Sequence, residues 1–334
     1  MYILLTCSVT FIASYLGSYV FQRFAYKNNI VAKLNFRTLH HQETPKSGGV
    51  IISFIYTIWF LITHYSSSSI DTQLIYITIG AVLSSLVGFV DDILDLKPVL
   101  KLLIQSLMAM SILVVIFSFS FFMSNIFNFL FFLLMTLFLV WVINSINFMD
   151  GIDGLCSSLT ISILSAASLG MFINEIPSSS FIPLLILSSI CLGFLLINLS
   201  TKKLFMGDSG SLFLAYLLCA FALKTIVSEE LNIWSWSILF SFCLTETSAT
   251  TAYRLLRIKK WYGAHRSHAY QNLARVLENH KIVTGGVVLY HCFWLAPLSF
   301  LSLIYTSASL IFLFLAIFPV LVFNLYYGPR YSSS

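Results

Sequence analysis

The stretch that decides the fold reads TQLIYITIGAVLSSLVGFVDDILDLKPVLK, residues 72–101. Residues 72–90 carry no charge, and about 20 consecutive apolar residues are enough for a helix to cross a bilayer. An acidic pair, Asp91 and Asp92, follows at once, and Lys101 closes the stretch. The stretch therefore predicts a membrane-spanning helix that ends in a cluster of charges.

The rest of the chain has the same apolar character. Of its 334 residues, 58% are hydrophobic and 9% are charged, whereas soluble domains are about 45–50% apolar and about 25% charged. This composition excludes disordered, coiled-coil, fibrous and disulfide-rich secreted proteins. The apolar residues form long runs rather than short alternating segments, which argues against a barrel. We therefore expect an all-α polytopic membrane protein, with residues 1–334 forming a single integral membrane domain.

The apolar runs predict about eleven spans. They cover residues 2–22, 49–65, 72–90, 100–118, 127–146, 155–173, 181–198, 209–227, 232–252, 284–304 and 307–327. The first span is expected to be retained, because no basic residue precedes it and no A-x-A cleavage pattern follows it.

The charged residues are concentrated in one set of loops. Alternate loops of this arrangement cover about 23–48, 91–99, 147–154, 199–208 and 253–283, with the tail after 328. Counting Lys101 at the start of the next span, these loops hold every Lys and Arg except Lys224. The positive-inside rule places them in the cytoplasm, with the N-terminus outside and the C-terminus inside. The net charge of +5 thus reflects topology and does not indicate a nucleic-acid partner. Most acidic residues gather on the same face, which predicts a built site there.

The first acidic cluster joins Asp91, Asp92 and Asp95. On a helix the first two lie four and three residues before the third, so the carboxylates would share one face. They would repel one another without a cation, and Mg²⁺ prefers oxygen ligands together with substrate phosphates. Lys101 adds a mobile positive charge suited to phosphate. The cluster predicts a magnesium and phosphate site; the alternative is a solvated helix end.

A second motif, NSINFMDGIDG at 144–154, has a polar side chain at every third position: Asn144, Asn147, Asp150 and Asp153. An α-helix drifts by roughly 60° over three residues, so the four cannot share one face of an unbroken helix. Gly151 and Gly154 favour a break that turns the later pair towards a cavity. Two amides and two carboxylates suit a metal and a polar ligand; the alternative is a set of interfacial caps.

A third motif, GDSGS at 207–211, precedes the expected span at 209–227. Helix N-termini attract anions, and Asp208 is placed to hold a cation that bridges to them. The alternative is an N-cap followed by a glycine turn.

The largest predicted loop carries GAHRSHAYQ at 263–271. Arg266 between His265 and His268 suits a phosphate clamp, because a guanidinium is planar, permanently charged and bidentate. No Cys or Glu completes a zinc ligand set nearby. Contact with anionic lipid would explain the charges of this loop but not the order of its residues.

Two further features complete the candidates. The first loop carries NFRTLHHQETPKSGG at 35–49, in which Lys46 stands just before Gly48 and Gly49. Glycines there allow close backbone approach or helix entry. Glu246 lies inside an expected span, where a carboxylate is costly unless it is paired or functional.

Taken in chain order from residue 35 to residue 271, the segment at 35–49 and the four motifs above resemble the polyprenyl-phosphate N-acetylhexosamine-1-phosphate transferases of glycosyltransferase family 4. The matching patterns are N-x-R…H…T-P-K-x-G-G, D-D-x-x-D, N-x-x-N-x-x-D-G-x-D-G, G-D-S-G-S and H-R-S-H-A-Y-Q. The last resembles the branch that starts O-antigen or related surface glycans, and lacks the triple histidine of the peptidoglycan branch. The resemblance implies a multi-pass enzyme of the bacterial inner membrane whose active site faces the cytoplasm.

The resemblance also implies a reaction. The donor would be a UDP-N-acetylamino sugar, the acceptor undecaprenyl phosphate and the cofactor Mg²⁺, with Mn²⁺ as a substitute. The products would be a lipid-linked diphosphosugar and UMP. Expected partners are thus these two substrates and the lipid bilayer, with a homodimer left open.

Carried over residue by residue, the resemblance assigns the metal to Asn147 and Asp208. Asp91 and Asp92 match the essential acidic pair, and Lys101 matches a phosphate-binding lysine. Direct attack of the lipid phosphate on the sugar-linked phosphorus is expected, because a phosphate monoester has its second pKa near 6 and leaves a general base little proton to remove. A covalent aspartyl intermediate is the alternative.

His265, Arg266 and His268 match the loop that contacts the donor diphosphate. With the motifs above, the expected catalytic residues are Asp91, Asp92, Lys101, Asp208 and His265, and the expected substrate-binding residues are Lys46, Asn144, Asp150, Asp153, Arg266 and His268. Three positions depart from the family pattern: Glu43 replaces a proline, Ser47 a glycine and Glu246 an aspartate.

Two other classes compete with this interpretation. A transporter would place ionisable groups near the bilayer midplane in repeated, interrupted helices. An intramembrane prenyltransferase would use the acidic residues of 91–95 and 150–153 as two diphosphate-binding motifs. It would leave the motifs at 207–211 and 265–271 unexplained.

Overall fold

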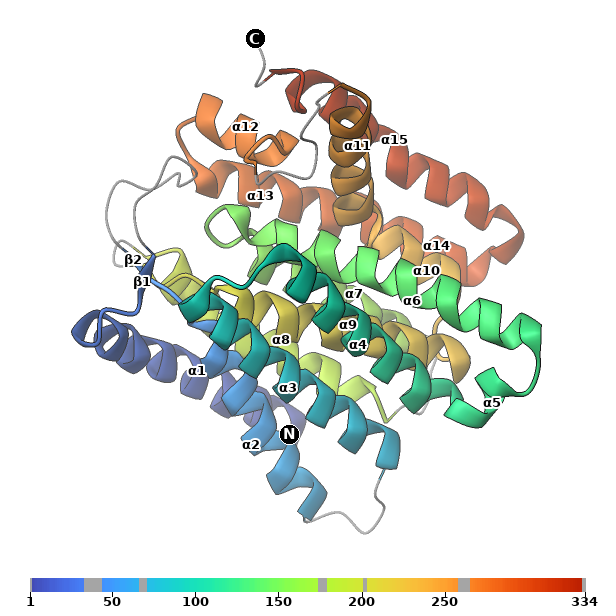
Figure 1. Ribbon diagram of the computed structural model, residues 1–334, viewed down its shortest axis with the longest axis horizontal. Helices are drawn as coiled ribbons and strands as arrows, with labels where there is room; N and C mark the ends of the chain where they lie inside the picture. Colours follow the sequence, from blue (N-terminus) through green and yellow to red (C-terminus); the bar gives the residue numbers. More distant parts are fainter. Residues whose placement is uncertain are drawn as a thin grey trace.

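The computed structural model describes residues 2–32, 44–65, 71–173, 179–200, 203–257 and 265–331 (Figure 1). The α-helices are α1 Tyr2–Lys27, α2 Gly49–Tyr65, α3 Thr72–Leu94, α4 Pro98–Phe117, α5 Phe119–Met123, α6 Ile126–Asn147, α7 Leu155–Ile173, α8 Phe181–Asn198, α9 Asp208–Val227, α10 Ile233–Leu239, α11 Ser241–Arg257, α12 Ala269–Val276, α13 His280–Tyr290, α14 Ala296–Ile304 and α15 Ser309–Tyr327. Shorter elements are the 3₁₀ helices η1 Phe148–Gly151 and η3 Thr306–Ala308, the π-helix η2 His291–Leu295, and the paired strands β1 Val31–Ala32 and β2 Thr44–Pro45.

Nine helical stretches of the described residues are long and apolar enough to cross a membrane. They correspond to α1, α3, α4, α6, α7, α8, α9, the run from α13 to α14, and α15 with η3. The prediction of an all-α polytopic membrane protein is confirmed. Of the other two expected spans, α2 is a shorter apolar helix. The number eleven and the orientation stay predictions.

The expected span at 232–252 is two helices rather than one. α10 ends at Leu239, and α11 continues to Arg257. α11 carries the buried charged residues Glu246 and Arg254, and it stands at a steep angle to its neighbours α6 and α15 (Figure 1). The break coincides with a change in composition, because α10 is largely apolar whereas α11 carries polar side chains such as Glu246, which is hydrogen-bonded to His268 and Ala269.

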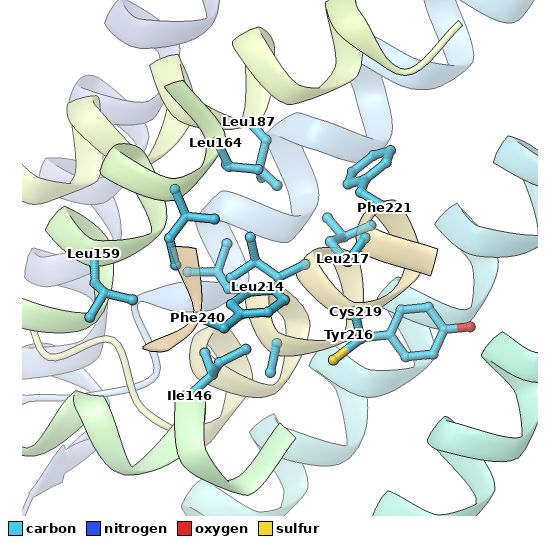
Figure 2. Close-up of a cluster of buried hydrophobic side chains, with 14 of the residues drawn as sticks. Ile146, Leu159, Leu164, Leu187, Leu214, Tyr216, Leu217, Cys219, Phe221 and Phe240 are labelled. Atoms are coloured by element: carbon cyan, nitrogen blue, oxygen red, sulfur yellow. The ribbon is translucent and has the colours of Figure 1, made fainter. Parts of the chain in front are cut away.

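α9 lies at the centre of the bundle (Figure 1). In its apolar window 83% of the residues are buried, compared with 17% in α1. Figure 2 shows side chains of the surrounding helices meeting α9: Ile146 of α6, Leu159 and Leu164 of α7, and Leu187 of α8, against Leu214, Leu217 and Phe221. Burial of this apolar surface fixes the position of α9 in the bundle and thereby the position of Asp208, its first residue.

A close helix contact brings the acidic end of α3 to the start of α9. A Cβ atom on Gly88 would lie 2.2 Å from the carbonyl oxygen of Asp208, so only glycine permits this approach. The segment before α2 is held to the same place, because Gly48 N donates to the carbonyl of Phe205 at 2.9 Å and Gly49 N donates to that of Met206 at 2.9 Å. Segments distant in sequence therefore converge at one end of the bundle.

Candidate active site

Four elements meet at this end, on the left of Figure 1: α3 and α6 end here, and α4 and α9 begin here. We call it the site end. Asp91, Lys101, Asn147 and Asp208 line one small pocket between them. Its remaining wall is Val87, Leu96, Ile104, Gln105 and Leu212. One residue from each of the four elements thus faces a common space.

Lys101 lies between two carboxylates of different helices. Its Nζ is 2.7 Å from Asp91 Oδ2 and 3.6 Å from Asp208 Oδ2. Asp91 is buried, and its Oδ1 also accepts a hydrogen bond from Leu96 N at 2.9 Å. The ammonium group is therefore held in place by Asp91 and offsets charge at the mouth of the pocket.

Asp92 points elsewhere and binds the start of α9. Its Oδ1 accepts from Asp208 N at 3.0 Å and its Oδ2 accepts from Ser209 N at 3.3 Å. Lys46 Nζ donates to the backbone carbonyl of Asp92. α3 ends one residue before Asp95, which has a left-handed φ of 50° and is exposed. The expected single acidic face does not form, because the helix ends before its third member.

The predicted break in the second motif is confirmed. α6 ends at Asn147, η1 follows, and Gly154 has a φ of +76°. Asn147 Oδ1 accepts a hydrogen bond from Ser211 Oγ at 2.6 Å, which ties α6 to α9. Asn144 Nδ2 donates to Oε1 of Gln105, a residue of the pocket wall, at 2.7 Å. Gln105 was not predicted, although its spacing was a signal because it follows Lys101 by one helical turn. Ser211 belongs to the third motif, but its hydrogen bond to Asn147 was not predicted.

The turn before α9 is held between two carboxylates. Gly207 N donates to Asp150 Oδ2 at 3.2 Å. Gly207 has a φ of +73°, and a Cβ atom there would lie 2.4 Å from Asp92 Oδ2. Asp92 and Asp150 therefore accept the backbone N–H groups that the third motif was expected to offer to an anion. The residue of this turn that lines the pocket is Asp208.

Asp153 takes part in a different cluster. Its carboxylate forms an ion pair with Lys203, and its Oδ2 lies 2.9 Å from His280 Nδ1. Burial raises the pKa of Asp153, but hydrogen bonds from His280 and Lys203 outweigh this, so the pKa lies below its ordinary value. The structure places Asp153 outside the lining of the site pocket, and Lys203 and His280 were not predicted.

The loop with the two histidines packs on η1. The hydroxyl of Tyr270 donates to the backbone carbonyl of Phe148. The ring of His268 lies 5.5 Å from that of Phe148 and 5.1 Å from that of His265. His268 thus lies beside the second motif, and none of His265, Arg266 and His268 lines the site pocket. Burial, with the nearby charges of His268 and Arg254, lowers the pKa of His265 to about 3.

Glu246 anchors this loop. It is fully buried, its Oε2 lies 2.7 Å from His268 Nδ1, and its Oε1 accepts from Ala269 N at 2.8 Å. Ala269 is the first residue of α12. The carboxylate thus fixes both the imidazole of His268 and the start of α12. The sequence predicted that this acid is paired or functional, and the structure shows it paired: Thr250 Oγ1, at 3.3 Å from Oε1, is a third partner.

Some predicted residues cannot be placed. Asn35, Arg37, His40, His41 and Glu43 of the first loop lie outside the described residues.

The pocket suits a hard divalent cation that arrives with substrate. Among the described residues no three His, Cys, Asp or Glu side chains are grouped to hold a metal. Asn147 and Asp208 nevertheless offer oxygen donors to one pocket, and Mg²⁺ is commonly held by one or two carboxylates with water and substrate phosphates completing its shell. The donor set fits that mode of binding and not a dedicated protein cage.

Comparison with known proteins adds independent information. Residues 74–226 match the profile of glycosyl transferase family 4. A phospho-N-acetylmuramoyl-pentapeptide-transferase of Streptococcus sanguinis (strain SK36) is 30% identical over 273 residues, 73% of this chain and 80% of that protein. A probable undecaprenyl-phosphate N-acetylglucosaminyl 1-phosphate transferase of Bacillus subtilis (strain 168) is 27% identical over 316 residues, 91% of this chain and 85% of that protein. A phospho-N-acetylmuramoyl-pentapeptide-transferase of Prochlorococcus marinus (strain NATL2A) is 30% identical over 218 residues, 59% of this chain, which spans 56% of that protein's length.

Proposed function

Because the chain belongs to glycosyl transferase family 4, the polyprenyl-phosphate hexosamine-1-phosphate transferase superfamily, we propose that it transfers a UDP-linked N-acetylamino-sugar 1-phosphate to undecaprenyl phosphate. The products are a lipid-linked diphosphosugar and UMP. In this proposal residues 1–334 form one transferase domain, the site end faces the cytoplasm of a bacterial inner membrane, and the product initiates an O-antigen-like surface glycan. The name of one relative supports undecaprenyl phosphate as the acceptor, since the Bacillus subtilis protein is named for it.

The observation that carries the proposal is the shared pocket of Asp91, Lys101, Asn147 and Asp208. Both substrates bring phosphate groups, and phosphoryl transfer depends mainly on positioning and on stabilising charge. Lys101, held by Asp91, is placed to neutralise a phosphate at the pocket. Asn147 and Asp208 would hold Mg²⁺, which when bound offsets the charge of the donor diphosphate.

The proposed chemistry is a direct displacement. An oxygen of the dianionic lipid phosphate attacks the sugar-linked phosphorus, the bond from that phosphorus to the bridging oxygen breaks, and UMP leaves with the electron pair. No proton has to be removed from the acceptor. Asp92 and Asp150 act on the geometry, because they hold the turn that presents Asp208. Arg266 supplies charge from the histidine loop, whereas His265 stays uncharged at neutral pH because its pKa is about 3.

The test is the transfer of label into lipid. Membranes containing the chain are supplied with undecaprenyl phosphate and a panel of radiolabelled UDP-sugars. We expect label to enter lipid with an N-acetylamino sugar. Asp208→Asn should abolish divalent-cation-dependent transfer with the protein still expressed, and Asp95→Asn, at the exposed position of the first acidic cluster, should leave transfer unchanged. Uptake of intact sugar into vesicles would indicate a transporter. Transfer of the prenyl group from an added prenyl diphosphate, with no label entering lipid from any UDP-sugar, would indicate a prenyltransferase. Either result would overturn the proposal.

A further inference from the structure

The segment that leads into α9 takes its geometry from other parts of the chain. Residues 203–207 lie outside any helix or strand, so no regular hydrogen-bond pattern of their own fixes them. At the first residue of the segment, Lys203 pairs with Asp153. At the last residue, Gly207 N donates to Asp150 Oδ2 at 3.2 Å. The placement of the second motif therefore helps to set where the segment delivers the start of α9.

The first turn of α13 holds Asp153 by both its side chain and its backbone. His280 Nδ1 lies 2.9 Å from Asp153 Oδ2, and Thr284 Oγ1 donates to the carbonyl of Asp153 at 2.8 Å. Residues four apart lie on one face of a helix, so both contacts come from the same side of α13. An ionised carboxylate only accepts hydrogen bonds, so Nδ1 is the imidazole nitrogen that carries a proton.

His280 is not needed to begin α13. Asn279 is the N-cap of this helix, and its Oδ1 accepts from Lys281 N at 3.0 Å and from Ile282 N at 3.3 Å. His280 is also absent from the lining of the active-site pocket. Its imidazole is instead bonded to the carboxylate that holds Lys203.

We propose that His280 is a positioning residue for the transferase. It holds Asp153, which in turn holds Lys203, and the segment that begins at Lys203 presents Asp208 to the pocket. This inference rests on the proposed function, in which Asp208 would hold Mg²⁺. Side chains that orient a metal ligand without touching the metal typically change metal affinity or activity about 10–100-fold when they are removed. Because His280 acts through two intermediate side chains, we expect an effect at the lower end of that range.

The first measurement needs neither metal nor substrate. Hydrogen–deuterium exchange of the purified full-length chain follows the N–H groups of Gly207, Asp208 and Ser209, which all donate to carboxylates. His280→Leu should speed their exchange about tenfold, the effect of losing one hydrogen bond to a charged group. His280→Asn should exchange like the wild type, because its side-chain amide offers a donor at the reach of Nδ1.

The second measurement is the Mg²⁺ dependence of label transfer to lipid. His280→Leu should raise the Mg²⁺ concentration for half-maximal transfer about tenfold, and His280→Asn should keep the wild-type value. The control for a general loss of stability is Asn125→Ala, which removes the exposed N-cap of α6 at the end of that helix opposite the pocket. It should lower the apparent Tm and leave both readouts at wild-type values.

Four results would overturn the proposal. Wild-type exchange in His280→Leu would show that the segment does not depend on this contact. Faster exchange with an unchanged Mg²⁺ dependence would break the link to Asp208. Equal acceleration in Asn125→Ala would show a general loss of stability. A His280→Asn protein as impaired as His280→Leu would show that the imidazole does not act as a hydrogen-bond donor.

Two further outcomes separate this proposal from the others. A wild type whose exchange behaves as expected, but which transfers no label to lipid, would contradict the proposed function instead. Thr284→Val removes only the hydroxyl that donates to Asp153 and should speed the same exchange, so it keeps the test decisive if His280→Leu fails to fold.

Discussion

Asp92→Asn separates a structural role of the acidic pair from a chemical one. The carboxylate accepts the N–H groups of Asp208 and Ser209 at 3.0 and 3.3 Å, and so it caps α9 from a neighbouring helix. Asparagine keeps one acceptor oxygen and turns an amide NH₂ group towards the other N–H. The substitution therefore removes one charge-assisted hydrogen bond and the negative charge at the start of α9.

The size of the effect follows from these two losses. A hydrogen bond to a charged group contributes about 1.5–3 kcal/mol, and a negative charge at a helix N-terminus contributes about 0.3–1 kcal/mol. We expect Asp92→Asn to lower the free energy of unfolding by about 2–4 kcal/mol. Because Asp208 is the first residue of α9, the pocket is disturbed as well. A displacement of about 1 Å can cost about 100-fold in rate, so turnover should fall by roughly 10–100-fold.

The assay measures stability and turnover on the same preparations. Apparent Tm is recorded in detergent at one scan rate, and transfer of label to lipid is recorded in parallel. Asp95→Asn is the control, since Asp95 is exposed with a left-handed φ of 50° that asparagine readily adopts; both readouts should stay at wild-type values. An Asp92→Asn protein with wild-type Tm and no turnover would refute the capping role and assign Asp92 to the chemistry.

Three further predictions concern single side chains. Ser47 has a φ of +66°, a left-handed conformation that costs a non-glycine residue about 1–2 kcal/mol, so Ser47→Gly should raise the apparent Tm; an unchanged or lower Tm would argue against strain there. The pKa of Asp153 is lowered by His280 and Lys203 against the opposing effect of burial, so its contribution is complete above the ordinary value of about 3.9 and is lost as the pH falls through the lowered folded value. The Tm of the wild type should therefore fall more steeply below about pH 4 than that of Asp153→Asn, and parallel curves would contradict this. Partial burial lowers the pKa of His265 to about 3, so its labelled imidazole should show no NMR titration between pH 5 and 8, and a midpoint near 6.5 would disprove the half-buried neutral state. Because the unfolded imidazole gains its proton near pH 6.5, His265 should also make the fold less stable as the pH falls below that value.

Much of the fold follows from local sequence. Apolar runs such as 72–90 are continuous and long, so periodicity and length alone predict helices that cross a membrane. Connectivity then brings the ends of alternate spans to one face. For this reason Asp91, Asn147 and Asp208 could be predicted to lie near one another, and they line one pocket.

The roles within the site depend on long-range contacts that spacing does not contain. Asp91 and Asp92 are adjacent in sequence, yet Asp91 binds Lys101 and Asp92 binds the start of α9. Likewise Asp150 and Asp153 are three residues apart, and the break at η1 sends the first to Gly207 and the second to a separate cluster.

The hydrogen-bond partners of Glu246 likewise could not be predicted from the sequence. Its place inside an apolar run predicts that it is paired or functional. Its partners, His268 Nδ1 and Ala269 N, belong to a loop whose packing is set by the three-dimensional structure, and the sequence does not indicate which polar groups that loop turns inward.

The most direct test follows the phosphorus atoms of the donor. The purified chain is incubated with undecaprenyl phosphate and a UDP-N-acetylamino sugar labelled with ³²P either next to uridine or next to the sugar. The account predicts that the phosphorus next to the sugar enters lipid in an amount equal to the UMP released, and that the phosphorus next to uridine stays in UMP. Sugar entering lipid while both phosphorus atoms remain in UDP would contradict it.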